Sequence, residues 1–426
     1  MAKQVVVFSP HSPFPPTGGS HLRCMEMLTA LAELGCAVTL VGSTMLSNSR
    51  WSTPKAIEFF GHLGIEVELY RLAPFDFEIG RLLKRVYRPM WSKQTLTPRL
   101  PSPPGMRRWF TDLLDRRRPD VVWMNYACWD GLLAGARDAA LRRTVDTHDL
   151  ITRNMQMQIS LASAIRCART AGALCAEHCL LDDGFFDGLD WSASTTEFEI
   201  YDSYDCTIAI SRKEGRIIAD STKKTFVKTI PMTLEPTAPG NTHDDLPIMV
   251  LGAHLFNLQG GLFFGHRVLP RLLRKAPGFR CRVTGRVSRD RLMPRSSALW
   301  SQGFVANLAP YYRRAQFALC PVFGGTGQQV KIVEAMAHGL AVVALRRGAE
   351  SSPIRHGING FLADNAAEFA EHTLSLWYDK DACRRMGEAA RETIATEYSR
   401  AQLLEDVWEV LNAPSSGRAD ARGALI

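Results

Sequence analysis

Residues 323–344 read Phe323-Gly-Gly-Thr-Gly-Gln-Gln-Val-Lys-Ile-Val-Glu-Ala-Met-Ala-His-Gly-Leu-Ala-Val-Val-Ala344, and they are the most informative part of the sequence. Its pattern predicts a strand that ends near Pro321, a glycine loop, and a helix that begins near Gln329 and ends at Gly339. A second strand is expected over Leu340–Leu345. Strand, loop, helix and strand in this order are typical of a parallel α/β sheet.

The same stretch predicts a phosphate site. Glycines tolerate positive φ angles and let a ligand approach bare backbone. The N-terminus of the predicted helix offers unpaired N–H groups, Lys331 adds a full positive charge in its first turn, and Glu334 offers a carboxylate to a sugar hydroxyl. The pattern therefore favours a nucleotide diphosphate with its ribose. The predicted contacts are Gly324, Gly325, Thr326, Gly327, Lys331 and Glu334.

Length and composition describe an ordinary globular protein of two domains. The chain has 426 residues, of which 46% are hydrophobic and 22% are charged. No apolar run is long enough to span a bilayer, and Val5–Phe8 is too short for a signal peptide, so we expect a cytoplasmic protein. The ten cysteines are expected to be reduced and mostly buried. Cys175, His178 and Cys179 lack a fourth ligand at a familiar spacing, so no metal site is predicted.

The net charge of +8 is unevenly placed. Residues 81–110 contain eight basic residues and no acidic one, interleaved with large apolar side chains. This composition fits peripheral contact with an anionic membrane, an acidic acceptor or a solvated loop, and the sequence leaves these alternatives open. No nucleic-acid recognition motif accompanies the basic stretch, so nucleic acid is not an expected partner.

Both halves of the chain alternate predicted strands and helices. Buried strands are expected at Val5–Ser9 and Val38–Val41, and again after a linker at residues 231–247. This alternation predicts doubly wound parallel sheets whose ligands lie at the carboxyl ends of strands. The expected domains are residues 1–235 and 248–395, followed by a C-terminal helix and flexible tail at 396–426. Residues 150–200 are expected to be either an acceptor-side insertion or a connecting pair of helices.

Four motifs together resemble the retaining GT-B glycosyltransferases of family 4, the glycosyl transferases of group 1. They are residues 323–344, the loop Ser9-Pro-His-Ser-Pro-Phe-Pro-Pro-Thr-Gly-Gly19, the run Tyr204–Ser211 followed by Glu214, and Ser301–Tyr312. The resemblance implies two Rossmann-like domains that face each other across a cleft. It also implies sugar transfer from a nucleotide-diphosphate sugar, UDP or GDP above all, to an acceptor hydroxyl, with retention and without metal or another cofactor.

The resemblance carries roles for particular residues. Glu334 matches the glutamate that binds the nucleotide ribose, whereas Thr326 stands where the family's other glutamate contacts the donor sugar. Gly18 and Gly19 belong to the loop that faces the donor diphosphate and the acceptor. His148, in Val145-Asp-Thr-His-Asp149, is the candidate contact to donor sugar or acceptor, and Asp149 is a candidate base. His11 is a weaker candidate, and His338 fits a helix cap better than a catalyst.

One departure from the family pattern bears on activity. Many members carry an arginine and a lysine after the first strand of the second domain, where this chain has Ala253 and Gln259. Lys331 and the helix N-terminus must then stabilise the leaving diphosphate, with His254 and Arg286 as candidate helpers. Two alternatives stay open: an inactive GT-B subunit that supports a partner transferase, and a nucleotide-sugar epimerase. The acceptor is equally open among glycans, lipid-linked sugars and natural products.

Overall fold

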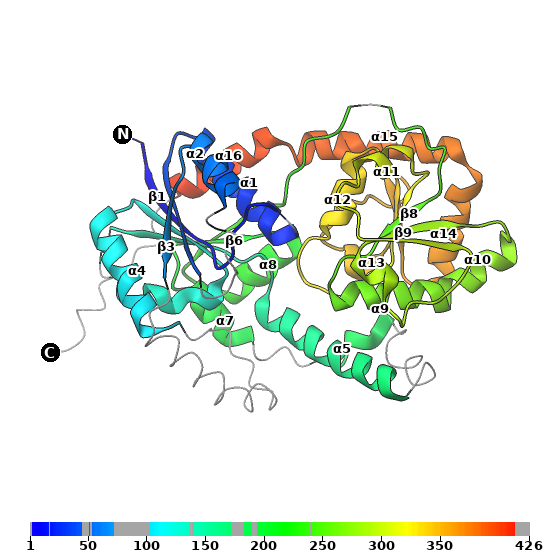
Figure 1. Ribbon diagram of the computed structural model, residues 1–426, viewed down its shortest axis with the longest axis horizontal. Coiled ribbons are helices and arrows are strands. Elements are labelled where there is room, and N and C mark those ends of the chain that lie inside the picture. The colour runs from blue at the N-terminus through cyan, green and yellow to red at the C-terminus, as the bar shows by residue number, and fades with distance from the viewer. Residues whose placement is uncertain are drawn as a thin grey trace. The chain divides into compact units, whose positions relative to one another are not determined.

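The computed structural model describes residues 2–413, apart from residues 17, 45–50, 52, 72–101, 137, 139, 172–182, 190–193 and 239 (Figure 1). The chain divides into two compact units. One contains Met1–Arg153, Trp191–Met232 and Ala401–Ile426, and the other contains Asn154–Asp190 and Thr233–Arg400. Each unit is built on its own parallel sheet, which confirms the predicted α/β class with a doubly wound sheet in each half.

The first unit has a sheet of seven described strands in the order β3-β2-β1-β4-β5-β6-β7. Every pair in it is parallel, and the central strand β1 pairs Val5 with both Val38 and Val121. The strands are β1 Gln4–Phe8, β2 Ala37–Ser43, β3 Glu66–Tyr70, β4 Val121–Asn125, β5 Arg142–Asp146, β6 Cys206–Ala209 and β7 Phe226–Thr229.

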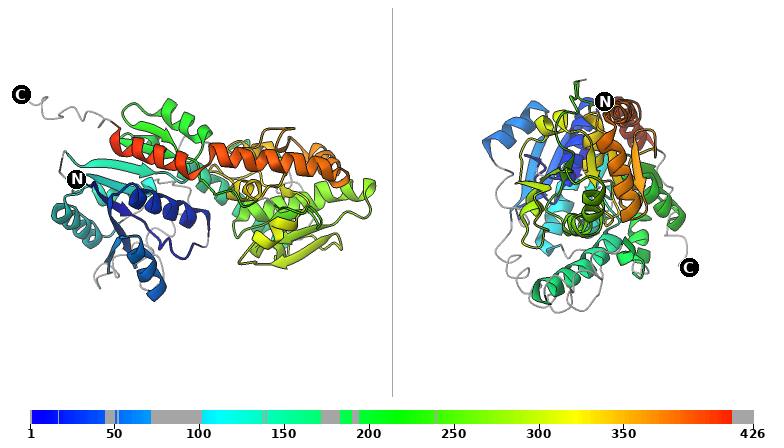
Figure 2. Two further views of the ribbon diagram at one scale, coloured as in Figure 1. Left: turned by 90° about the horizontal axis from the view of Figure 1, so that it is seen from above. Right: turned by 90° about the vertical axis from the view of Figure 1, so that its right-hand side faces the viewer.

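Helices cover both faces of this sheet because strand side chains alternate between faces. Val5 and Val7 point to one core and Val6 and Phe8 to the other. The first core lies under α1 Gly19–Glu33, α2 Pro54–His62 and α16 Arg400–Asn412, of which α16 contributes Leu403, Val407 and Val410 (Figure 2). The second lies under α4 Pro104–Arg117, η2 Ala127–Leu133, α7 Ser194–Tyr201 and α8 Arg212–Ser221.

The second unit has six described strands, all parallel, in the order β10-β9-β8-β11-β12-β13. They are β8 Ile248–Val250, β9 Cys281–Thr284, β10 Leu299–Gly303, β11 Ala318–Cys320, β12 Val342–Leu345 and β13 Gly360–Ala363. Its helices are α9 Leu255–Phe263, the π-helical turn η4 Phe264–Val268, α10 Leu269–Lys275, η5 Arg286–Arg289, α11 Ala309–Arg314, α12 Val330–Ala337, α13 Arg346–Ala349, α14 Ala366–Tyr378 and α15 Lys380–Glu397.

Helix α9 packs very closely on the chain that follows β11. A Cβ atom at Gly260 would lie 2.8 Å from the Pro321 carbonyl oxygen, so only glycine fits at this position. The contact holds the middle of α9 against the start of the segment that leads into α12. Helix α9 therefore supports the start of this segment.

The region that the sequence left open, residues 150–200, contains α5 Ile151–Ala171 and α7, with the short turn η3 Asp183–Phe186 between them. The buried Phe186 ring lies 6.0 Å from Phe256 and 6.3 Å from Phe323. Asp187, just after the turn, forms an ion pair with Arg347 of α13. This part of the region thus packs on the second unit.

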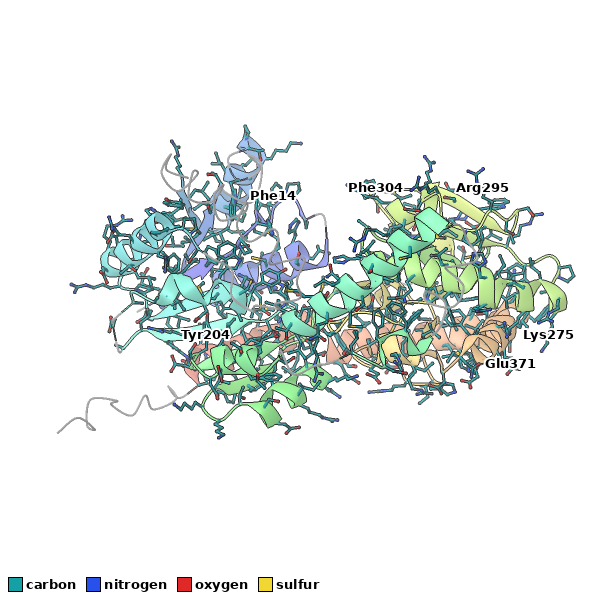
Figure 3. The ribbon with its side chains drawn as sticks, turned by 90° about the horizontal axis from the view of Figure 1, so that it is seen from below. Phe14, Tyr204, Lys275, Arg295, Phe304 and Glu371 are labelled. Carbon is teal, nitrogen blue, oxygen red and sulfur yellow. The ribbon has the colours of Figure 1, made fainter. Side chains whose placement is uncertain are left out.

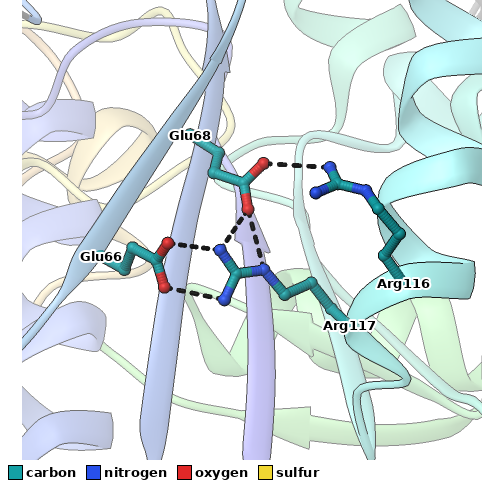
Figure 4. A network of polar contacts seen from close by, with 4 residues as sticks. All are labelled: Glu66, Glu68, Arg116 and Arg117. Carbon is teal, nitrogen blue, oxygen red and sulfur yellow. Dashed lines mark hydrogen bonds and ion pairs between the residues drawn. The ribbon is translucent and has the colours of Figure 1, made fainter.

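Strand β3 and helix α4 are joined by an ion-pair network near the edge of the first sheet (Figure 4). Arg117 contacts both Glu66 and Glu68, and Arg116 lies 3.3 Å from Glu68. The two glutamates hold the pKa of Arg117 above its usual range through hydrogen bonds. The predicted basic segment 81–110 lies outside the described residues up to position 101. Its last part begins α4.

The linker predicted at 231–247 contains no helix or strand among its described residues, yet it is tied to the second unit. The Thr237 N–H donates to the Ala337 carbonyl, and the Asn241 amide donates to the Tyr312 carbonyl at 2.9 Å. The described cysteines are free thiols, and most of them are buried. Cys175, His178 and Cys179 lie outside the described residues. Among the helices that the structure describes, none has the length and apolarity to cross a membrane.

Candidate functional site

The loop between β11 and α12 exposes backbone where the sequence predicts a ligand. Gly325 has φ +106°, a conformation that side chains rarely adopt. A Cβ atom at Gly324 would lie 2.4 Å from the Phe256 ring and 2.8 Å from the Phe186 ring, so the neighbouring aromatics leave room for glycine alone. Thr326 and Gly327 complete the loop before α12 begins at Val330. A ligand can therefore approach the unpaired N–H groups of the first turn of α12 past glycines that carry no side chain.

Lys331 lies in the first turn of α12, and its ammonium group contacts the Oδ1 atom of Asn257. Asn257 is buried in the first turn of α9, so the two helix beginnings meet through this contact. Burial lowers the pKa of Lys331 from its ordinary value. The neutral amide orients the ammonium group without cancelling its charge. The charge thus stays available to an anion.

Glu334 follows one turn later on the same helix. The Tyr312 hydroxyl donates a hydrogen bond to its Oε2 atom at 3.3 Å, and Oε1 has no hydrogen-bond partner among the described residues. Burial raises the pKa of Glu334, and the Tyr312 hydrogen bond partly offsets that rise. One carboxylate oxygen is therefore held in place while the other can accept from a ligand hydroxyl.

Helix α12 ends as the sequence predicts. His338 is its C-cap residue, and the ring nitrogen Nδ1 lies 2.8 Å from the Glu334 carbonyl oxygen. Gly339 follows with φ +72°, the left-handed conformation that commonly ends a helix. His338 therefore caps α12, and its ring packs 4.9 Å from the Tyr312 ring that supports Glu334.

The positions of the expected arginine and lysine hold no cation. Ala253 is exposed, and Gln259 is fully buried with neither side-chain amide atom hydrogen-bonded to a described residue. His254 is the N-cap residue of α9, and desolvation lowers its pKa, with a further decrease from the Lys331 charge. Arg286 lies over the Phe304 ring at 5.5 Å. Of these residues, only His254 is linked electrostatically to Lys331.

A second polar cluster lies in the first unit, where β4 and β5 end. His148 has φ +58° and is buried, and its ring stacks on Tyr126 at 4.2 Å. Its Nε2 atom lies 2.8 Å from Asn125 Oδ1, while Asn125 Nδ2 donates to the Phe8 carbonyl at 2.8 Å. Because the amide nitrogen is already donating, Oδ1 must accept, and the imidazole proton is on Nε2. Burial lowers the pKa of His148 to about 4, so the ring is neutral near pH 7, with Nδ1 as an acceptor.

Asp146, two residues before His148, is committed to a structural ion pair. It lies 2.9 Å from Arg23 of α1, and both side chains are fully buried. Asp149 is half-buried and is engaged by neighbouring groups. Gly18 is the N-cap residue of α1 and Gly19 is its first residue. Burial raises the pKa of Tyr126 and the nearby Ser20 side chain opposes that rise, so the residue after this glycine loop lies near the ring that stacks on His148.

The N-terminus of α5 looks like an anion site but is filled by the protein itself. Glu197 accepts from the backbone N–H groups of Ile151 and Thr152 at 2.8 and 2.9 Å, and Glu214 accepts from Leu150 at 3.1 Å. Both glutamates are buried. Carboxylates at a helix N-terminus are stabilised by its partial positive charge. Glu214, which follows the Tyr204–Ser211 run in the motif, therefore has a structural role.

Comparison with known proteins places this geometry in a family. Residues 247–379, which include the entire α12 site, match the family described as Glycosyl transferases group 1. The HepE protein of Anabaena, solved with UDP and glucose, superposes with a TM-score of 0.62 at 13% identity over 97% of this chain and 100% of that chain. Residues 247–379 thus match the group 1 glycosyltransferases, and the chain has the GT-B fold.

Two further relatives extend this finding. Sucrose-phosphate synthase from Thermosynechococcus elongatus superposes with a TM-score of 0.62 at 15% identity, over 96% of this chain and 98% of that chain. Trehalose phosphorylase of Grifola frondosa is 40% identical over 74 residues, which are 17% of this chain and 10% of that protein. The chain therefore matches about a tenth of the length of that curated relative, while its fold extends over whole solved chains.

Sequence reasoning missed two residues of the α12 site, Asn257 and Tyr312. Asn257 and Gln259 are the two amides in the otherwise apolar helix Leu255–Phe263, and this contrast was an available signal. Tyr312 ends the Ser301–Tyr312 motif, but nothing in that motif indicates a contact with Glu334. The structure brings these two residues to Lys331 and Glu334 from positions 74 and 22 residues away.

Proposed function

We propose that this protein transfers a sugar from a nucleotide-diphosphate sugar to an acceptor hydroxyl, with retention of anomeric configuration and without a metal ion. The observation that carries the proposal is the pair of supported side chains on α12: Lys331 held by Asn257, and Glu334 held by Tyr312. A cation and a carboxylate one helical turn apart suit a diphosphate and the ribose attached to it.

The proposed chemistry breaks the bond between the anomeric carbon and the diphosphate oxygen. The acceptor oxygen forms the new bond on the face that the diphosphate leaves, and its proton passes to the departing phosphate oxygen. Negative charge grows on the diphosphate during this step, so a preorganised ammonium group lowers the barrier. Lys331 supplies that charge together with the first N–H groups of α12.

UDP-sugars are the donors we propose first. Solved HepE complexes contain UDP and UDP-glucose, and their fold superposes on nearly the whole chain. In the first unit, the Nδ1 atom of His148 is the group we propose for contact with a hydroxyl of the donor sugar or acceptor. Asp149 and the Gly18–Gly19 loop remain proposed contributors on the acceptor side. The acceptor itself stays unassigned among the classes considered above.

The absent cations at Ala253 and Gln259 favour one alternative, a GT-B subunit that binds nucleotide but supports a partner's catalysis. An active transferase and a supporting subunit differ in whether the purified chain releases UDP from a UDP-sugar. The active enzyme releases UDP from a UDP-sugar when the purified chain is supplied with acceptor extracts, and it loses this activity in Lys331→Gln. The supporting subunit binds UDP but releases none without its partner.

Thermal stabilisation by UDP, GDP and TDP tests the donor site, since a ligand of the folded state raises the melting temperature. We expect one nucleotide to stabilise the wild type and to lose its effect in Glu334→Gln and Lys331→Gln. Matched controls are Glu371→Gln and Lys275→Gln, exposed residues of the same unit that lie outside the α12 site (Figure 3). The proposal is wrong if no nucleotide stabilises the wild type, or if the controls lose as much as the site variants.

A further inference from the structure

A polar pocket of about 680 Å³ lies in the second unit beside the edge strand β10. None of the residues that line it belongs to the α12 site. Strand β10 supplies Leu299 and Ser301, which point to the same face because they are two residues apart. The segment between η5 and β10, residues 290–298, forms one wall of the pocket. The pocket is within the size range of small-molecule sites.

The wall of this pocket is fixed to α9 and η4 by close packing. A Cβ atom at Gly261 would lie 2.7 Å from the Met293 sulfur, and one at Gly265 would lie 2.4 Å from Pro294. Two glycines in successive turns therefore let residues 293 and 294 rest directly on the helix. The wall is therefore packed against α9 and η4, and the backbone that carries its arginines is held in place.

The pocket's floor also contains a connected set of hydroxyl groups. The Ser301 hydroxyl donates to the Ser288 carbonyl at 2.8 Å, and the Ser288 hydroxyl donates to the Gly285 carbonyl at 2.8 Å. The Gly303 N–H donates to the Ser288 hydroxyl oxygen at 3.1 Å. These bonds hold both serines in one orientation. Because both serine protons are donated within the protein, a ligand hydroxyl can only donate to this floor, and the Ser301 oxygen is the acceptor it offers.

Positive charge dominates the pocket, because three arginines and one aspartate line it. Arg289 donates to the Gln302 carbonyl at 3.1 Å, which holds it against β10. Arg291 and Arg295 are exposed and make no hydrogen bond or ion pair with any described residue (Figure 3 labels Arg295). Asp290 accepts from the Leu292 N–H at 3.0 Å and so uses part of its charge within the wall.

We propose that this pocket binds a phosphorylated carbohydrate, with the phosphate held by Arg291 and Arg295 and the sugar hydroxyls facing the serine floor. Guanidinium groups match the oxygens of a phosphate with two parallel hydrogen bonds, which makes arginine the preferred residue for this anion. The volume exceeds what a phosphate ion alone needs. The site is separate from the proposed nucleotide site, so it does not depend on the proposed function.

Isothermal titration calorimetry with glucose 6-phosphate, inorganic phosphate and glucose tests the proposal. The wild type should bind glucose 6-phosphate more tightly than either of the other two. The double variant Arg291→Gln/Arg295→Gln should weaken this binding by about tenfold or more, since each guanidinium makes charge-assisted bonds. Its control is Arg274→Gln/Arg385→Gln, which removes the same charge from exposed positions on α10 and α15 and should leave the affinity unchanged.

The melting temperature separates a local effect from misfolding. The Arg291→Gln/Arg295→Gln variant should melt at the wild-type temperature. If UDP stabilises the wild type, it should stabilise this variant by the same amount. The proposal is overturned if glucose 6-phosphate does not bind, or if both double variants weaken it equally. Equal affinity for inorganic phosphate and glucose 6-phosphate would overturn the assignment to a carbohydrate.

Discussion

The contact between Lys331 and Asn257 leads us to expect that the affinity for UDP depends on pH. Burial lowers the pKa of Lys331, so its positive charge is lost at a lower pH than that of an exposed lysine. UDP affinity should be greatest below that lowered pKa and fall as the pH rises through it. The folding equilibrium responds in the opposite sense. The unfolded chain binds the proton more tightly, so the cost of burying the ammonium is present below the folded pKa and disappears as the pH approaches 10.5.

Two substitutions at Asn257 move this titration in opposite directions. Asn257→Leu removes the acceptor of a hydrogen bond to a charged group, worth about 1.5–3 kcal/mol. At about 1.4 kcal/mol per pKa unit, the pKa of Lys331 should fall by about one to two units. Asn257→Asp places a carboxylate beside the ammonium group and raises that pKa. It also cancels the charge that UDP needs, so this variant should bind weakly at pH 7 but keep its affinity to higher pH.

The assay is the UDP dissociation constant measured from pH 7 to pH 10. Lys331→Gln is the control, because any pH dependence that remains in it comes from other groups, the uracil ring included. We expect the affinity midpoint to move to lower pH in Asn257→Leu and to higher pH in Asn257→Asp. The same midpoint in the wild type and both variants would show that Asn257 does not control the Lys331 charge, and the reasoning would fail.

Three further predictions concern the first unit. Asp146→Ala leaves the Arg23 guanidinium buried without its partner, so the free energy of unfolding in urea should fall by about 3–5 kcal/mol, and a loss below 1 kcal/mol would contradict the buried ion pair. Asn125→Ala removes the acceptor that keeps the His148 proton on Nε2, so nitrogen NMR should show a shift toward the Nδ1 tautomer; an unchanged tautomer would refute the assignment. Arg117→Ala breaks a partly exposed network and should cost only about 0.5–1 kcal/mol, less at high salt, measured by thermal unfolding at two salt concentrations.

The sequence predicts the central strands of both sheets but not most of the edges. Strands β1, β2 and β11 are mostly apolar and almost entirely buried, and this pattern is easy to recognise. Strands β7, β10 and β13 were not predicted. Each lies at an edge and has partly exposed residues: β7 and β10 carry polar side chains there, and β13 is a short strand of four residues that begins with glycine. The pairing of these strands therefore depends on the neighbouring strand more than on their own composition.

The candidate site divides in the same way. Lys331 and Glu334 lie on one helix turn, so spacing alone predicts that they share a face. Their partners Asn257 and Tyr312 come from α9 and α11, and only the tertiary fold brings them near. The tautomer of His148 was equally inaccessible, because it depends on where the Asn125 amide group donates. The sequence therefore predicts the charged side chains of the site, but not the residues that hold them in position.

The position of α16 has a consequence for how the chain folds during synthesis. The core of the first unit includes Leu403, Val407, Val410 and Leu411, so strand β1 and these residues share one apolar layer although about 400 positions separate them. Contacts at such separation form late, since the whole intervening chain must be made first. While the ribosome completes the second unit, the α1 face of the first keeps a strip of apolar surface uncovered. A chaperone that binds such strips should therefore associate with nascent chains that end before residue 400 and release those that include α16.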